Sequence, residues 1–153
     1  MSIEQNKAIV SRFYEELWNN RNLRIADEII APDCITHQLQ SGAVSVGMPR
    51  NPEAVKHHVN EWLIGFPDLH FDVEQIIAEE DRVVSQSVMQ GIHTGPWLGI
   101  APTNKEVSIR LMVTQRIIGG KIVEDWVLVE ALGFFQALGL LPPTQEIISK
   151  VVK

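Results

Sequence analysis

The sequence predicts an α+β fold in which three N-terminal helices pack against a strongly curved, mainly antiparallel sheet, forming a cone-shaped barrel. Apolar residues recur at helical spacing up to Phe66, and after Pro67 they alternate with polar residues as in strands. The 153 residues are 45% hydrophobic, which is enough for one domain with a real core. We find no internal repeat and no linker. The sequence therefore predicts a single domain over residues 1–153, with residues 143–153 as a C-terminal tail.

Each of the three helices has a recognisable start. Ser2 and Gln5 match a capping box, and Asn22 can cap a second, shorter helix that Pro32 ends. Asn51 is followed by Pro52 and Glu53, a typical beginning for the third helix. The apolar stripes of these helices are Val10, Phe13, Leu17 and Trp18; Leu23, Ala26, Ile29 and Ile30; and Val55, Val59, Trp62 and Phe66.

Five segments are predicted to be strands. Residues 33–38 form a first short strand, and the segment between Gln40 and Arg50 has the composition of a loop. The four later strands span 70–77, 82–93, 106–117 and 121–132.

The glycine pair Gly119-Gly120 sets the expected register of the last hairpin. If both glycines are central turn residues, Ile118 pairs with Lys121. Regular alternation then places one set of residues on the interior face and the other on the outer face. The interior set is Ile109, Leu111, Val113, Gln115, Glu124, Trp126, Leu128 and Glu130, and the outer set includes Arg110, Met112, Thr114, Asp125, Val127 and Val129.

Composition excludes several classes of function. The formal net charge is −6 and Lys and Arg do not cluster, which argues against nucleic acid as a partner. The single cysteine, Cys34, cannot form an intrachain disulfide and is typical of a reducing compartment. The first twenty residues carry charges, and no stretch has the roughly 20 apolar residues of a membrane span. We therefore expect a cytoplasmic protein without a membrane partner.

Cofactor and metal motifs are missing from the sequence. There is no P-loop, GxGxxG, HxxxH, HExxH or cysteine pair, and no serine lies in a nucleophile elbow. His57 and His58 lie about 100° apart on one helix, so they cannot chelate together. We expect no metal site.

Glu130 is the carboxylate most expected to carry chemistry. It interrupts the apolar run "DWVLVEALGFF", and in an apolar pocket its pKa would rise toward neutrality. The alternatives are an incorrect register for this strand or an ion pair with an arginine such as Arg110. His93, at the end of its strand, is expected to face inward near the pocket mouth, and His37 could approach from the first short strand. A structural histidine and an exposed loop histidine are the respective alternatives.

The open end of such a cone is a natural pocket for a small apolar molecule. Its expected substrate-binding residues are Trp126, Trp97, Trp62, Met89, Val113, Leu128 and His58. Core packing is the alternative for each tryptophan, and solvent exposure is the alternative for His58.

Four phrases in order resemble the SnoaL-like polyketide cyclases, a branch of the nuclear transport factor 2-like superfamily. They are "FPDLHFDVEQIIAEEDRVV", "GIHTGPWLGIAPTNKEV", "GGKIVEDW" and "LGFFQALGLLPP". The resemblance implies a cone-shaped barrel that is dimeric or tetrameric and binds polycyclic or other apolar molecules without a cofactor. It also implies an acid/base carboxylate on the last strand, usually Asp, at the position of Glu130. His93 matches the histidine of the family's THxG phrase, and His37 matches one that often follows the second helix.

The first functional hypothesis is a cofactor-independent cyclase or isomerase acting on a polyketide-like or other enolisable carbonyl compound. Glu130 would move the proton, while His93, with His37, would bind the carbonyl oxygen. In a second hypothesis Glu130 is the base that activates a water molecule, and Gln115 and Glu124 are the further polar groups around that water. The reaction would be hydration or hydrolysis of an epoxide or ester. A third is a non-catalytic binding module with a vestigial pocket. In each case the apolar outer face of the sheet predicts a homodimer or homotetramer.

Overall fold

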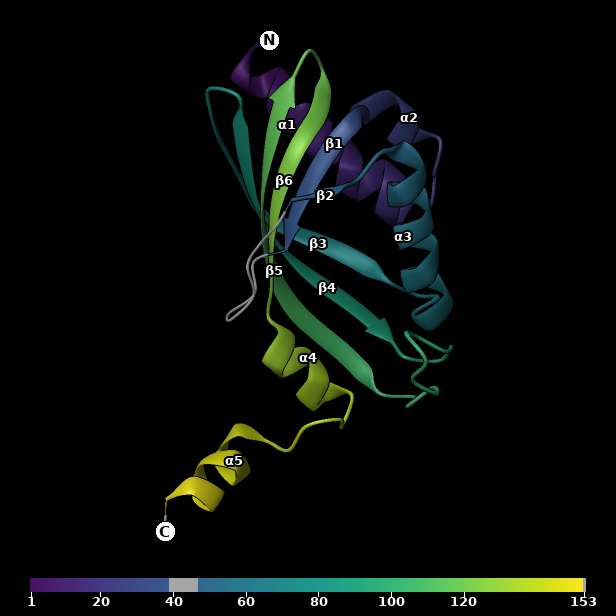
Figure 1. Ribbon diagram of the computed structural model, residues 1–153, viewed down its shortest axis with the longest axis vertical. Helices are drawn as coiled ribbons and strands as arrows, with labels where there is room; N and C mark the ends of the chain where they lie inside the picture. The colour runs from purple at the N-terminus through teal and green to yellow at the C-terminus, as the bar shows by residue number, and fades with distance from the viewer. Residues whose placement is uncertain (39–46, 153) are drawn as a thin grey trace.

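A computed structural model describes residues 1–38 and 47–152 and confirms the α+β class, with helices packed against a curved, open sheet (Figure 1). Most of the loop expected between Gln40 and Arg50 falls outside these residues. The helical segments are α1 (Ile3–Arg12), η1 (Phe13–Asn19), α2 (Ile25–Ile29), α3 (Pro52–Gly65), α4 (Ala131–Ala137) and α5 (Thr144–Val151). The strands are β1 (Ile30–Gln38), β2 (Met48–Pro49), β3 (His70–Glu79), β4 (Arg82–Ile92), β5 (Glu106–Ile118) and β6 (Lys121–Val129).

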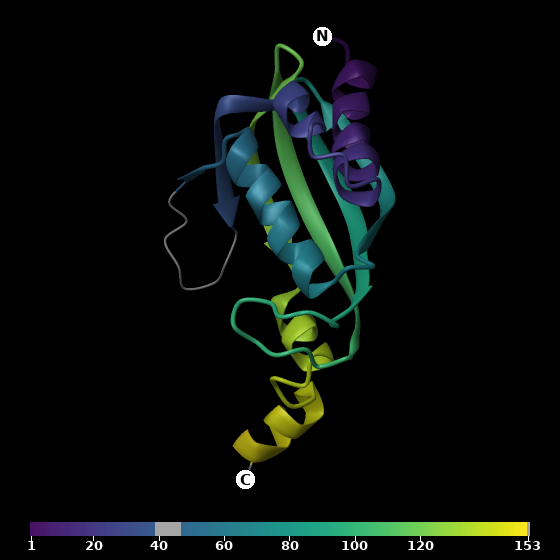
Figure 2. The same ribbon diagram turned by 90° about the vertical axis from the view of Figure 1, so that its right-hand side faces the viewer.

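The N-terminal helices cover one face of the sheet, as predicted. Figure 2 shows α1 and α3 over the same face of the sheet, with part of the sheet visible between them, while α4 and α5 extend beyond one end of the sheet. Val10, Leu17, Ala26 and Val59 are fully buried between these two layers. None of the helices in the described ranges is long and apolar enough to span a bilayer.

Local start signals explain where two of the helices begin. The capping box of Ser2 and Gln5 is formed, and the Asn51 side chain accepts a hydrogen bond from the Ala54 N–H. After Arg12 the first helix continues as the π-helix η1, a wider turn that still buries its apolar side. The expected boundary after α2 is wrong: β1 already begins at Ile30, so Pro32 lies in the strand instead of ending the helix.

The sheet has the order β2-β1-β6-β5-β4-β3. All neighbouring strands are antiparallel except β1 and β6, which run parallel. This parallel pair brings a strand from the first quarter of the chain beside the last one. The predicted turn is also confirmed, because Gly119 and Gly120 both have positive φ and Ile118 pairs with Lys121.

One extra residue in β6 reverses the predicted faces of this strand. Ile117 pairs with Ile122, but Arg116 pairs with Glu124, so Val123 is a β-bulge. A shift of one residue moves every following side chain to the opposite face. The inner face of β6 therefore carries Asp125, Val127 and Val129, paired with Gln115, Val113 and Leu111.

The residues predicted to be interior on β6 are consequently on the outer face. Glu124, Trp126 and Leu128 pair there with Arg116, Thr114 and Met112. The strand also ends earlier than expected, at Val129, and Glu130 is the residue that precedes α4.

Deletion of Val123 should destabilise the protein, because either the residues before it or those after it must change faces. The less costly outcome exposes Ile122, which is completely buried. Exposing one such side chain costs about 2 kcal/mol. We expect urea denaturation to show at least that loss in the free energy of unfolding. Val123→Ala, which preserves the bulge, should lose only about 1 kcal/mol; an equal loss in the two variants would contradict the register.

Candidate active site

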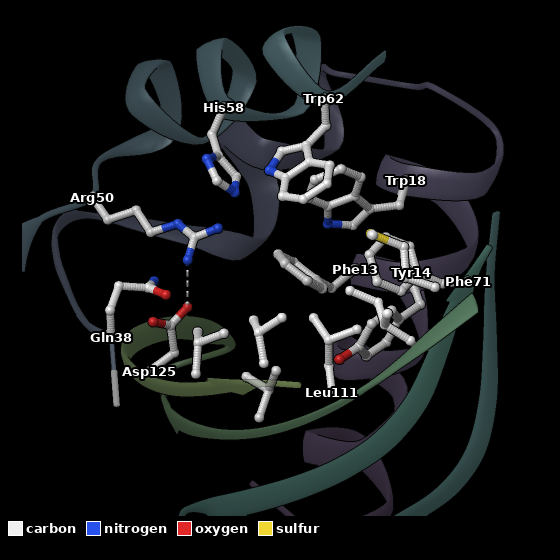
Figure 3. A pocket seen from close by; sticks show the side chains of 15 residues that line it. Phe13, Tyr14, Trp18, Gln38, Arg50, His58, Trp62, Phe71, Leu111 and Asp125 are labelled. Carbon is white, nitrogen blue, oxygen red and sulfur yellow. Dashed lines mark hydrogen bonds and ion pairs between the residues drawn. The ribbon is translucent and has the colours of Figure 1, made fainter. Parts of the chain in front are cut away.

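A hollow lies between the concave face of the sheet and the helices (Figure 3). Its empty volume, including the open mouth, is about 650 Å³. The lining is mostly apolar, with a few polar groups. The lining residues are Phe13, Tyr14, Trp18, Gln38, Arg50, His58, Trp62, Phe71, Met89, Ile109, Leu111, Val113, Asp125, Val127 and Val129.

Among the described residues that line the hollow, Asp125 is the only carboxylate. It projects inward from β6 and is 3% exposed. Its Oδ1 accepts a hydrogen bond from the Thr36 hydroxyl at 2.5 Å, and its Oδ2 lies 3.2 Å from Nη1 of Arg50. Figure 3 shows the arginine and the aspartate facing each other at one side of the hollow. Buried charges of this kind persist only when they are paired.

The fold brings these three residues together from distant positions in the chain. Thr36 is the direct register partner of Asp125 in the parallel pair β1–β6. Arg50 precedes the cap of α3, and its backbone N–H donates to the carbonyl oxygen of Cys34 at 2.7 Å. The start of α3 is thereby fastened to β1. Gln38, two residues after Thr36 and on the same face, donates to the Thr36 hydroxyl at 3.4 Å.

Burial raises the pKa of Asp125 above its ordinary value, and attraction to Arg50 and the hydrogen bond from Thr36 oppose this rise. The carboxyl group is thus displaced toward the pH range in which a group can both accept and return a proton.

Arg50 keeps hydrogen-bond donors available for a ligand. Within its guanidinium group, only Nη1 is bonded to protein, to Asp125 and Thr36, among residues 1–38 and 47–152. A guanidinium carries five N–H donors in a fixed plane, so the remaining ones are free to contact an oxygen in the pocket.

His58 is a neutral imidazole in the upper wall of the pocket. Burial first, and then the charges of Arg50 and His57, lower its pKa to about 4. Its ring meets Trp18 edge-on, with ring centroids 6.0 Å apart. A neutral imidazole at neutral pH can donate one hydrogen bond without bringing a charge.

Four of the predicted substrate-binding residues do line the pocket: Trp62, Met89, Val113 and His58. Trp97 does not. It is buried behind Trp62, with ring centroids 4.8 Å apart.

The prediction that Glu130 lies inside the pocket is wrong. The residue is exposed and precedes α4, because the bulge reverses the strand and the strand ends at Val129. The predicted positions of Trp126 and Leu128 are wrong for the same reason. Leu128 is 48% exposed on the outer face.

The two predicted catalytic histidines are also outside the hollow. His93 is fully buried, and its Nδ1 accepts a hydrogen bond from the Thr103 N–H at 3.2 Å, which fastens the following loop. His37 lies on the outer face, where its Nε2 is 2.8 Å from Oε1 of Glu124 and its ring stacks on Trp126.

The sequence analysis missed Asp125, Arg50, Thr36, Gln38 and Tyr14. For Asp125 the missing signal is the bulge, since the residue has the right type but was assigned to the outer face. Arg50 is the only Lys or Arg between Arg24 and Lys56, a weak signal that a permanent positive charge is needed there. Among the described residues no group of His, Cys, Asp and Glu could hold a metal ion.

The sequence profile of SnoaL-like polyketide cyclases matches residues 8–138. The chain belongs to this family. No curated protein matches this SnoaL-like protein.

Solved structures show the same fold along nearly the whole chain. AclR, a proposed hydroxylase from Streptomyces galilaeus, has a TM-score of 0.81 at 26% identity, covering 98% of this chain and 90% of AclR. IdmH, a proposed polyketide cyclase from Streptomyces antibioticus, has a TM-score of 0.75 at 26% identity, covering 88% and 99%. A proposed SnoaL-like polyketide cyclase from Jannaschia sp. CCS1 has a TM-score of 0.78 at 24% identity, covering 94% and 97%.

His58 should make the stability of this SnoaL-like protein depend on pH in a defined window. A partly buried neutral histidine contributes stability above its unfolded pKa of 6.5, and that stability is lost as the pH falls toward the folded pKa of about 4. Full loss amounts to about 3 kcal/mol at most.

The measurement is urea denaturation across this window. His58→Gln should remove this part of the pH dependence, whereas His57→Gln, a change at the exposed neighbour, should retain it. Identical pH dependence in the wild type and His58→Gln would rule out a neutral imidazole at this position.

Proposed function

We propose that the protein is a cofactor-independent cyclase or isomerase that uses Asp125 as acid and base on an enolisable, largely apolar carbonyl compound. The observation that carries the proposal is a 3% exposed carboxylate, held by two partners and projecting into a mostly apolar hollow. Membership of the SnoaL-like polyketide cyclases supports a small-molecule substrate.

The proposed reaction is an intramolecular aldol closure. The Asp125 carboxylate removes a proton from the carbon beside a carbonyl group, leaving an enolate. The enolate carbon forms a bond to a second carbonyl carbon of the same molecule, whose oxygen becomes an alkoxide. That alkoxide takes the proton back from the Asp125 carboxyl group. Atoms and charge balance within one molecule, so the reaction requires no oxidant, reductant or cofactor.

Arg50 and His58 support the charge that develops on oxygen. The unused N–H donors of Arg50 and the neutral His58 ring lie in the same pocket lining as Asp125. Donors already fixed in a water-poor site stabilise an enolate more than water does. Arg50 also keeps the raised pKa of Asp125 from rising further, so that a carboxylate remains available as a base.

Two observations bear on the other hypotheses. A vestigial cone should be filled by its own side chains, whereas this one is hollow. The water-directed hydrolase or hydratase needed Gln115 and Glu124 on one inner face, but the bulge separates them, and Glu124 is bonded on the outer face to His37 and Arg116.

The test is exchange of the acidic hydrogens of a ketone in deuterated water. The probe is 6-hydroxy-1-tetralone, and the loss of its α-proton signal is followed by NMR. We expect the wild-type protein to accelerate exchange and Asp125→Asn to lose this acceleration by about 10²-fold or more, the scale of deleting a general base. Because burial raises the pKa of Asp125, the acid limb of the rate profile should lie above the ordinary range of an aspartate.

Glu130→Gln is the matched control. It removes an exposed carboxylate beyond the end of the same strand and should change the exchange rate by less than about threefold. Loss of exchange in Glu130→Gln with retention in Asp125→Asn would overturn the assignment and restore the carboxylate that the sequence pattern favours.

We further propose that the protein is a homodimer through the outer face of the sheet. Val127 and Val129, predicted there, are in the pocket instead, but Met112 and Leu128 are register partners on that face and each is 48% exposed. Ile77, on the outer face of β3, is 56% exposed. A second copy would remove this apolar surface from water.

Sedimentation analysis checks the assembly. We expect a dimer mass for the wild type and a monomer mass for Met112→Glu, because a buried unpaired charge opposes association. The control is Leu98→Glu, a change at an exposed loop residue, which should remain dimeric. Met89→Glu cannot serve as the control, because Met89 lines the pocket. A monomeric wild type in dilute solution would contradict the proposal.

A further inference from the structure

Thr36 reaches Asp125 from a part of the sheet that the backbone fixes weakly. β1 pairs with β6 at Ile30 and again over residues 35–38, and a register irregularity separates the two stretches. On its other side β1 is joined, within the described chain, to the two-residue strand β2. Strand ends with so little pairing open more readily than the middle of a sheet. The position of Thr36 therefore needs support beyond the backbone hydrogen bonds.

This support comes from the opposite face of the sheet. His37 follows Thr36 and points outward, and its Nε2 lies 2.8 Å from Oε1 of Glu124, the residue before Asp125. The side chains of His37 and Glu124 are only 19% and 22% exposed, so water screens this pair less than a typical surface pair. The pairs Thr36–Asp125 and His37–Glu124 thus hold the same stretches of β1 and β6 together from the inner and the outer face.

Glu124 is itself fixed, so His37 is bonded to an anchored group. Its Oε2 accepts a hydrogen bond from Nη1 of Arg116 at 3.1 Å, and Nε of Arg116 donates to Asp81 at 3.1 Å. The hydrogen bond with His37 is the largest of the causes that hold the pKa of Glu124 below its ordinary value. The carboxylate is ionised and can only accept, so Nε2 of His37 is the donor.

The imidazole of His37 has little room to turn away from Glu124. One face of the ring stacks on Trp126, with ring centroids 5.2 Å apart and an interplanar angle of 6°. The chain returns past the ring at Gly47, where an added Cβ atom would lie 2.9 Å from Cε1 of His37. The contacts with Glu124, Trp126 and Gly47 together fix the side chain of His37 on the outer surface.

A displacement of His37 would be felt at Asp125. Consecutive Cα atoms are about 3.8 Å apart and rigidly linked, so Thr36 must move when its neighbour moves. The hydrogen bond from Thr36 to Asp125 is 2.5 Å long, and a displacement of about 1 Å would break it. A misplacement of that size near a reacting group can reduce a rate by about 10²-fold.

We propose that His37 and Glu124 are positioning residues for Asp125 and act through Thr36 from the far side of the sheet. Neither residue lines the hollow, so neither contacts a substrate there. This inference rests on the proposed function, because it assigns to the outer face a part in the acid–base reaction. It also gives the histidine that sequence analysis placed in the pocket a role in the same reaction from outside the pocket.

The first measurement is the α-proton exchange of 6-hydroxy-1-tetralone in deuterated water. His37→Phe retains a ring that can stack on Trp126 but removes the N–H donor. We expect kcat to fall about tenfold and KM to change by less than about threefold, because the apolar lining is untouched. His37→Gln offers an amide N–H to Glu124 and should restore kcat to within about threefold of the wild type.

Two further variants make this result specific. Glu74 binds Arg110 on the same outer face, with Oε1 and Nη2 3.0 Å apart, but this pair joins β3 to β5 and does not involve β1. Glu74→Gln should therefore change kcat by less than about twofold. Because His37 acts through Thr36, adding His37→Phe to Thr36→Val should cost less than about threefold beyond Thr36→Val alone.

The second measurement does not require catalysis: it is the pKa of Asp125 from carboxyl-carbon NMR. The hydrogen bond from Thr36 and the charge of His37 each lower this pKa. Both His37 variants remove the charge, but only His37→Phe loosens Thr36, so the pKa of Asp125 should rise further in His37→Phe than in His37→Gln. If the wild type showed no exchange, the acid–base function would fail while this comparison would still test the positioning.

Three results would overturn the proposal. An equal pKa of Asp125 in His37→Phe and His37→Gln would show that His37 acts by charge alone. A loss of kcat in Glu74→Gln as large as that in His37→Phe would show a general effect of outer-face ion pairs. Full additivity of His37→Phe with Thr36→Val would show that the histidine does not act through the threonine.

Discussion

The burial of one carboxylate is the constraint on which the rest of the site depends. Asp125 can remain inside an apolar hollow only because Thr36 and Arg50 reach it, and each does so for a separate structural reason. The parallel pairing of β1 with β6 supplies the threonine, and the fastening of the start of α3 to β1 supplies the arginine. The bulge at Val123 turns the carboxylate inward. The ion pair between Asp125 and Arg50 thus depends on strand order, helix placement and local register together.

Much of the fold could be predicted because its signals are local. The capping box at Ser2, the cap at Asn51 and the paired glycines 119 and 120 act within four residues, so the sequence pattern displays them directly. The change from helical to alternating spacing after Pro67 correctly separated the helices up to α3 from the strands β3 to β6. The helices α4 and α5 were not predicted. The apolar residues after Val129 continue the strand pattern without a clear breaker, which concealed α4, and residues 143–153 were assigned to a C-terminal tail, which concealed α5.

The site could be predicted only in part, because its residues meet through contacts between distant segments. Trp62 and His58 follow from the stripe of α3, and Met89 and Val113 follow from alternation that contains no irregularity. Predicting that Asp125 faces inward required knowledge of the bulge at Val123. No residue type nearby indicates this bulge, because Val123 is an ordinary strand residue. The contact with Arg50 spans 75 positions and depends on a parallel crossover that periodicity does not show.

Three of the four tryptophans divide between the two faces of the sheet in a way that is useful for spectroscopy, and the fourth, Trp97, is buried behind Trp62. Trp18 and Trp62 line the hollow, while Trp126 lies on the outer face between the stacked ring of His37 and the guanidinium carbon of Arg82, which is 4.8 Å from its ring centroid. A charged neighbour and a stacked imidazole change indole emission differently from an apolar wall. The intrinsic fluorescence of the protein therefore contains two separable signals, one from events inside the cone and one from events on its outer surface, without any added label.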